Sequence, residues 1–202
     1  MIKALLLDFG DVFLKLDKEA TFRELKKLGL NTFNPEMEQL NDAYEKGEVT
    51  SDKFVEYYQK WFPQASKQEL VSAWNAILVD FPKHRIEFLE NLAASKKYRL
   101  LLLSNTNEIH IDWVKSNIEY YEQFKNCFEK FYLSHEIGLR KPDAEVIEFV
   151  LNENDLSPEH LFFVDDTKMH TDSAKNLGIP VWNLNPKTDD ITELFNKNPY
   201  LL

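Results

Sequence analysis

Acidic, hydroxyl and lysine side chains follow short apolar runs at several points of the chain. Asp8 ends one such run, Ser104 ends a second, Asp165 and Asp166 end a third, and Lys141 stands in a polar loop between them. Carboxylates, a hydroxyl and an ammonium group are the side chains needed to bind a hard cation and an anion together.

Closely packed carboxylates repel one another unless a cation joins them. Mg²⁺ prefers oxygen ligands and also binds phosphate oxygens, so it meets this need. An aspartate can attack phosphorus once a metal ion and a lysine have neutralised the phosphoryl oxygens. Ser104 and backbone N–H groups near a helix start could hold those oxygens as well. The residue types favour phosphate chemistry with Mg²⁺ as the cofactor.

The apolar runs that precede these residues are typical of buried parallel strands, because they are short and apolar on both faces. They cover residues 2–7, 98–103, 130–133 and 161–164, and a weaker run covers 180–182. Helical patterns lie between them. Strands that alternate with helices predict an α/β protein with a doubly wound parallel sheet, which binds ligands at the carboxyl ends of its strands.

Residues 16–84 break this alternation, since they contain several helix-like stretches and no convincing strand. We interpret them as an all-helical cap inserted after the first strand. The predicted catalytic core then comprises residues 1–15 and 85–202.

The composition of the chain argues against several classes of site and partner. The chain has 202 residues, a formal net charge of -10 and one cysteine, Cys127, which excludes an internal disulfide and a zinc cluster built from thiolates. So acidic a surface repels nucleic acids and anionic membranes. No segment resembles a signal peptide or a membrane span, so we expect a cytoplasmic protein whose partner is a small-molecule phosphate ester.

The order Asp8, Ser104, Lys141, Asp165-Asp166 resembles the four motifs of the haloacid dehalogenase superfamily, with a helical cap after the first motif. The resemblance covers essentially the whole chain. The stretches Ser104–Asn107 and Gly138–Pro142 are similar to the branch that contains bacterial sugar-1-phosphate phosphatases and the phosphatase domain of soluble epoxide hydrolase. The pair Trp74-Asn75 is also similar to that branch.

The resemblance implies a role for each matching residue. Asp8 is the expected nucleophile and a metal ligand, Ser104 and Lys141 hold the phosphoryl group, and the backbone carbonyl of Gly10 binds Mg²⁺. The other expected contacts are Asp165 and Asp166 with the metal, and Asn105, Trp74 and Asn75 with the substrate.

Gly10 departs from the family pattern, because most phosphatases of the superfamily have an acidic residue there that protonates the leaving group. A sugar 1-phosphate has a better leaving group than an ordinary alkyl phosphate, so it depends less on this proton. Asp11 is either a displaced acid or a turn residue. His170 stands where the family often has asparagine, and we expect it to pack or to form a hydrogen bond in the following helix.

The sequence thus predicts a Mg²⁺-dependent phosphatase of small phosphate monoesters, such as sugar 1-phosphates, that acts through an aspartyl-phosphate. One alternative is a catalytically weak protein of this fold that binds a phosphorylated metabolite or a protein partner. A 2-haloacid dehalogenase is less favoured, since that branch usually lacks the acidic pair found here at Asp165-Asp166. Oligomeric state and the physiological substrate stay open.

Overall fold

A five-stranded, entirely parallel sheet forms the centre of the protein. The computed structural model describes residues 1–202, and the strand order is β5-β4-β1-β6-β7. The strands are β1 (Ala4–Leu7), β4 (Arg99–Ser104), β5 (Lys130–Leu133), β6 (Leu161–Asp165) and β7 (Val181–Asn183). The predicted α/β class with a doubly wound parallel sheet is confirmed.

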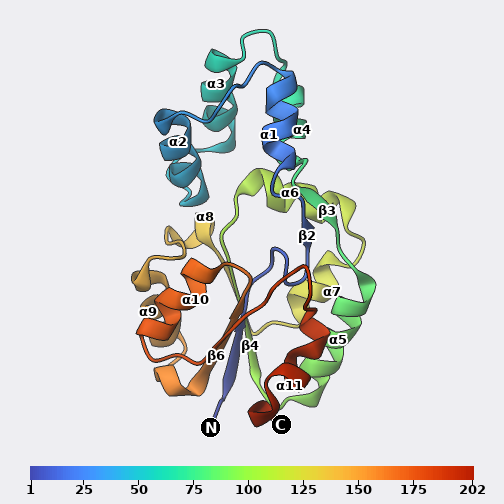
Figure 1. The fold of residues 1–202 in the computed structure, drawn as a ribbon, viewed down its shortest axis with the longest axis vertical. Coiled ribbons are helices and arrows are strands. Elements are labelled where there is room, and N and C mark those ends of the chain that lie inside the picture. The colour runs from blue at the N-terminus through green and yellow to red at the C-terminus, as the bar shows by residue number, and fades with distance from the viewer.

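Both faces of this sheet are buried under helices (Figure 1). Along β1, Leu5 and Leu7 pack on one face, while Ala4 and Leu6 pack on the other. Burial on both sides explains why the strands are continuously apolar rather than alternating. The helices of this part are α5 (Lys83–Ser95), α6 (Glu108–Asn117), α7 (Tyr121–Asn126), α8 (Ser134–Ile137), α9 (Ala144–Glu153), α10 (Lys168–Asn176) and α11 (Leu194–Lys197), with short 3₁₀ helices at Pro158–His160, Ile191–Glu193 and Pro199–Leu201.

Four further helices form a separate group beyond the carboxyl ends of the strands (Figure 1). They are α1 (Ala20–Lys27), α2 (Pro35–Glu45), α3 (Ser51–Trp61) and α4 (Lys67–Asn75). Their buried side chains form their own apolar cluster, to which α6 contributes Ile109. These helices lie in the segment expected to be a cap, and we refer to α1–α4 as the cap. The exact division of the chain into core and cap stays a prediction.

The expectation that residues 16–84 contain no strand was wrong at one edge. Leu78–Asp80 forms strand β3, which pairs antiparallel with β2 (Lys15–Leu16). Only Leu78 of β3 is buried, and its other two residues are exposed. A ladder this short gives no apolar alternation that sequence inspection could detect. The two segments mark the points where the chain leaves the sheet and returns to it. No helix of the structure combines the length and the apolar character needed to span a bilayer.

The cap also meets the sheet region on the side of α8. Gly47, just after α2, has a φ of +69°, and a Cβ at this position would lie 2.1 Å from the backbone oxygen of His135. Nearby, Arg140 forms an ion pair with Asp42 of α2. The missing side chain of Gly47 therefore permits a close backbone approach between cap and core.

Alanine substitutions at two glycines with similar φ angles measure how tight the close backbone approach at Gly47 is. Gly138 has a φ of +71°, and a Cβ at this position would meet no atom within 4 Å. Gly138→Ala should lower the free energy of unfolding by about 1–2 kcal/mol from backbone strain alone. Gly47→Ala should cost about 1–3 kcal/mol more, because it adds a steric clash. Urea unfolding measures both losses, and equal losses would show that the Gly47 contact is not tight.

Candidate active site

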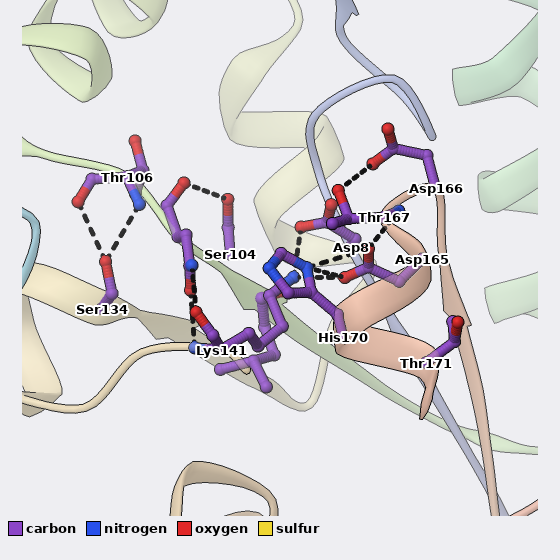
Figure 2. Close-up of polar contacts among 12 residues, drawn as sticks. Asp8, Ser104, Thr106, Ser134, Lys141, Asp165, Asp166, Thr167, His170 and Thr171 are labelled. Carbon is purple, nitrogen blue, oxygen red and sulfur yellow. Dashed lines mark hydrogen bonds and ion pairs between the residues drawn. The ribbon is translucent and has the colours of Figure 1, made fainter. Parts of the chain in front are cut away.

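A buried ammonium group lies between two carboxylates at the carboxyl end of the sheet (Figure 2). Lys141 Nζ donates hydrogen bonds to Asp8 Oδ1 at 2.8 Å, to Asp165 Oδ2 at 2.6 Å and to the backbone oxygen of Leu103 at 2.9 Å. Lys141 is only 1% exposed. An ammonium group has three donors, so all of them are used inside the protein. Asp8 follows β1 and Asp165 ends β6, so neighbouring strands bring the two carboxylates to one place.

Burial and charge shift the pKa values of this group in opposite directions. Burial raises the pKa of Asp8 to about 7, with Lys141 opposing the shift and the charges of Asp165 and Asp166 adding to it. Burial acts in the same sense on Asp165, but Lys141 and His170 hold its pKa below the ordinary value. Burial would lower the pKa of Lys141, yet Asp165 and Asp8 keep it raised, so Lys141 stays charged. Asp8 is thus the carboxylate that most needs a further cation.

A metal ion would satisfy this need. Oxygen atoms of Asp8, Asp165 and Asp166 lie within 4.8 Å of one another, close enough to share one ion. The donor set consists of carboxylate oxygens alone, which fits a hard divalent cation. The carbonyl of Gly10, expected to be a further ligand, accepts a hydrogen bond from Val12 N at 2.7 Å. A lone pair of that oxygen stays free, because a carbonyl has two.

Ser104 and Asn105 follow β4, the other neighbour of β1. The Ser104 hydroxyl is buried and makes only a 3.5 Å contact with the backbone oxygen of Asn105, so it keeps its donor for a ligand. Asn105 is differently engaged: its Nδ2 donates to the Lys141 carbonyl at 2.8 Å, and its Oδ1 accepts from Lys141 N at 2.9 Å. The Asn105 side chain therefore fixes the backbone of the lysine loop.

Two side chains that were not predicted to belong to the site contact its carboxylates. His170 Nδ1 lies 3.0 Å from Asp165 Oδ1, although it was expected only to pack or to form a hydrogen bond in its helix. Lys18 Nζ lies 2.5 Å from Asp166 Oδ2 and 3.1 Å from Asp11 Oδ2. Lys18 lies within the segment expected to be cap, and no spacing in the sequence connects it with Asp166.

Asp11 serves the turn after β1. Its φ is +54°, its Oδ1 accepts from Leu16 N at 3.0 Å, and its Oδ2 contacts Lys18. With both oxygens engaged, the structure favours the turn role over a displaced acid.

Trp74 and Asn75 are not brought to the acidic group. Trp74 packs against Phe54 and Tyr58 in the cap cluster, and its backbone oxygen lies 3.2 Å from His110 Nε2. Asn75 is buried, and its Oδ1 has no hydrogen-bond partner. Contact of either residue with substrate stays a prediction.

A cavity of about 110 Å³ lies between this site and the cap. Gly10, Ser104 and Asn105 line it on the side of the sheet, Leu16 lines it at the junction, and Glu45 lines it from the end of α2. His110 also faces this cavity. Burial lowers the pKa of His110 to about 4, so its ring is neutral at pH 7.

The chain is similar to known proteins over most of its length. The family model for haloacid dehalogenase-like hydrolases matches residues 11–184. D-ribitol-5-phosphate phosphatase of Bacteroides thetaiotaomicron is 26% identical over 187 residues, which cover 88% of this chain and 89% of that protein.

Solved structures agree with this match. The magnesium complex of a HAD family enzyme from Bacteroides thetaiotaomicron is 34% identical, with a TM-score of 0.86 over 96% of this chain and 98% of that one. The complex of this wild-type enzyme with magnesium and inorganic phosphate is 34% identical, with a TM-score of 0.85 over 96% of this chain and 100% of that one.

Because three carboxylates lie close together, we predict that a divalent cation stabilises the folded protein. Adding Mg²⁺ at millimolar concentration should raise the unfolding temperature, because the ion relieves repulsion among Asp8, Asp165 and Asp166 in the folded state only. Asp166→Asn should remove most of this gain, since it deletes a charged oxygen ligand. Asp172→Asn, which changes an exposed carboxylate paired with Lys168 on α10, should keep it. Scanning calorimetry with and without chelator gives the comparison, and an equal gain in both variants would refute the assigned ligands.

Proposed function

The chain belongs to the haloacid dehalogenase-like hydrolases, and we propose that within this family it is a Mg²⁺-dependent phosphatase of small, hydroxylated phosphate monoesters. One observation carries the proposal. Asp8, Lys141, Asp165 and Asp166 meet at the carboxyl ends of β1 and β6, where a nucleophile, a fixed cation and a hard-metal donor set coincide.

The two oxygens of Asp8 are not equivalent. Lys141 binds Oδ1, whereas Oδ2 has no hydrogen-bond partner within the protein. We assign Oδ2 as the atom that attacks phosphorus. The Oδ2–P bond forms while the ester P–O bond breaks, and the alcohol oxygen leaves with the bonding electrons and takes up a proton from solvent. Water then attacks phosphorus and loses a proton to solvent as the Oδ2–P bond breaks, which releases inorganic phosphate and restores the Asp8 carboxylate.

Other side chains of the chain prepare this attack. Lys141 keeps Asp8 oriented and supplies positive charge beside the phosphoryl oxygens. The free Ser104 hydroxyl donates to one of those oxygens. Mg²⁺ bound to Asp8, Asp165 and Asp166 would screen the repulsion between the carboxylates and a phosphate dianion. This screening matters because the chain carries a formal net charge of -10. The magnesium and phosphate complexes of the 34% identical enzyme support the choice of ion.

Gly10 and one of the relatives support a proposal for the substrate class. Gly10 supplies no acid for the leaving group, and positioned acid catalysis is worth about 10²–10⁴ in rate. Esters with a good leaving group, such as sugar 1-phosphates, suffer least from this loss. The relative that acts on D-ribitol 5-phosphate supports sugar alcohol phosphates as a second group of substrates. We propose both classes, with hydroxyl groups on the alcohol as the shared property.

Phosphate release from a panel of esters tests the proposed function. The panel contains glucose 1-phosphate, glucose 6-phosphate, ribitol 5-phosphate, glycerol 3-phosphate and phenyl phosphate, each with Mg²⁺ and with chelator. Asp8→Asn should lower turnover by about 10³-fold or more, because an amide is not a nucleophile here. Asp172→Asn serves as the matched control and should keep full activity.

The outcomes of this panel separate the candidate functions. Metal-dependent release that requires Asp8 establishes the phosphatase, and a preference for 1-phosphates over 6-phosphates supports the leaving-group explanation for Gly10. Full activity of Asp8→Asn would contradict the covalent mechanism. No release from any ester would favour a protein of this fold that only binds a phosphorylated ligand.

An acid can be returned to position 10 as a second test. A Cβ on Gly10 would lie 2.8 Å from Leu16 Cδ1, a flexible side-chain end. Gly10→Asp combined with Leu16→Ala relieves this crowding, and Leu16→Ala alone is the control. The double variant should hydrolyse glycerol 3-phosphate about 10-fold faster than the control, while phenyl phosphate changes little. The kcat values for the two esters decide, and equal changes would show that the missing acid does not limit the rate.

A further inference from the structure

Glu45 is a carboxylate that the cap directs toward the reaction site. It is the last residue of α2 and lines the cavity that Gly10, Ser104 and Asn105 border from the sheet side. Its side chain is 26% exposed, but its Oε2 is fully buried. Burial raises the pKa of Glu45, and the nearby Arg140 opposes this shift.

The Oε2 atom has no hydrogen-bond partner in the protein. Arg140 Nη2 lies 2.9 Å away and neutralises part of the charge, yet its N–H does not point correctly for a hydrogen bond. Arg140 Nε is likewise buried without a partner. The other oxygen, Oε1, is not buried and forms no hydrogen bond within the protein, so it is the atom of Glu45 that a ligand in the cavity can reach.

The other polar side chains around the cavity differ from Glu45 in this respect. Asn105 uses its amide on the backbone of Lys141, and His110 uses both ring nitrogens, on Asn107 and on the Trp74 carbonyl. Ser104 and Thr106 keep hydroxyl donors for a ligand, and Ser104 stands where the phosphoryl group is expected. Glu45 is therefore the one strong acceptor available to the part of a ligand that extends from the phosphate toward the cap.

We infer that Glu45 is a specificity-determining residue that accepts hydrogen bonds from hydroxyl groups of the leaving alcohol. The inference rests on the proposed phosphatase function and adds the residue that selects the substrate. A hydroxylated alcohol can donate hydrogen bonds to the accessible Oε1, whereas an apolar alcohol excludes water from this oxygen and leaves it without a donor. The ion pair with Arg140 orients the Glu45 carboxyl group for this contact.

The size of the cavity limits the leaving group. The cavity volume is about 110 Å³, which leaves room for a small alcohol only. The proposed position of the phosphoryl group is beside Asp8 and Lys141, which do not line the cavity, with Ser104 at the border between the two.

A wider cleft of about 860 Å³ lies on the other side of Asp11 and Lys18, and it is the alternative direction for the leaving group. Its lining includes neither Ser104 nor Asn105. Two of its basic side chains, Lys18 and Arg85, are paired with Asp166 and Asp190, while Lys15 and Lys187 form no ion pair. We place the leaving group in the smaller cavity, because Ser104 and Asn105 border that cavity and not the cleft.

Substitution of Glu45 tests the inference with two esters that differ in hydroxyl groups. Ribitol 5-phosphate donates hydrogen bonds from its alcohol part, and phenyl phosphate does not. Glu45→Met should lower kcat/KM for ribitol 5-phosphate about 10–100-fold, mainly through KM, and should change phenyl phosphate less than about 3-fold. Glu45→Gln should be intermediate, because a neutral amide oxygen is a weaker acceptor.

Asp42→Asn is the matched control. Asp42 lies on the same helix and pairs with the same Arg140, but it does not line the cavity. This variant should keep the preference of the wild type. Equal losses on both esters in Glu45→Met, or the same selective loss in Asp42→Asn, would overturn the inference while the phosphatase activity still stands.

Binding to the inactive Asp8→Asn variant separates this inference from the proposed function. We expect calorimetry to show that adding Glu45→Met lowers the affinity for ribitol 5-phosphate about 10-fold or more. The affinity for inorganic phosphate should not change. This result supports Glu45 even if the wild type releases no phosphate, in which case the proposed function alone fails. Equal affinities with and without Glu45→Met would refute the role of Glu45.

Discussion

Three carboxylates cannot share one end of a parallel sheet unless cations hold them there, and Lys141 is the buried cation that the fold supplies, with the half-exposed Lys18 beside Asp166. The Lys141 ammonium group has Asp8 and Asp165 as partners, so losing Lys141 would leave two buried carboxylates unpaired at a cost of about 3–5 kcal/mol. Asn105 fixes the lysine loop, and His170 Nδ1 contacts both carboxylate oxygens of Asp165. These contacts constrain the strand ends and orient Asp8 for chemistry.

The cap and the sheet contribute different parts of the candidate site. The sheet provides the groups proposed to bind phosphate, and Glu45 of α2 lines the small cavity beside them. Gly47 and Arg140 join the cap to the core on one side, and the Tyr44 hydroxyl accepts a hydrogen bond from Ile109 N of α6 at 3.1 Å. In this account, the chemistry is set by strand ends and the choice of alcohol by Glu45 of the cap.

The sequence predicted the sheet well because central parallel strands are apolar on both faces and stand out as short runs. The grouping of Asp8, Lys141 and Asp165 was foreseen for the same reason, since parallel strands end together. The sequence did not predict the contacts of Lys18, His170 and Glu45. Each reaches the site through a turn or a helix packing angle, which apolar periodicity does not encode. The ribbon β2–β3 was missed because it is too short to show a pattern.

The most direct test of the account is to trap phosphate on Asp8. Enzyme, Mg²⁺ and the best ester of the panel are mixed, quenched in acid within milliseconds to seconds, and digested for mass spectrometry. Since Gly10 offers no base to activate the attacking water, the aspartyl-phosphate should accumulate, and the peptide containing Asp8 should gain one phosphoryl group. Turnover with an unmodified Asp8 peptide at every quench time, or with the phosphoryl group on another residue, would contradict Asp8 as the nucleophile.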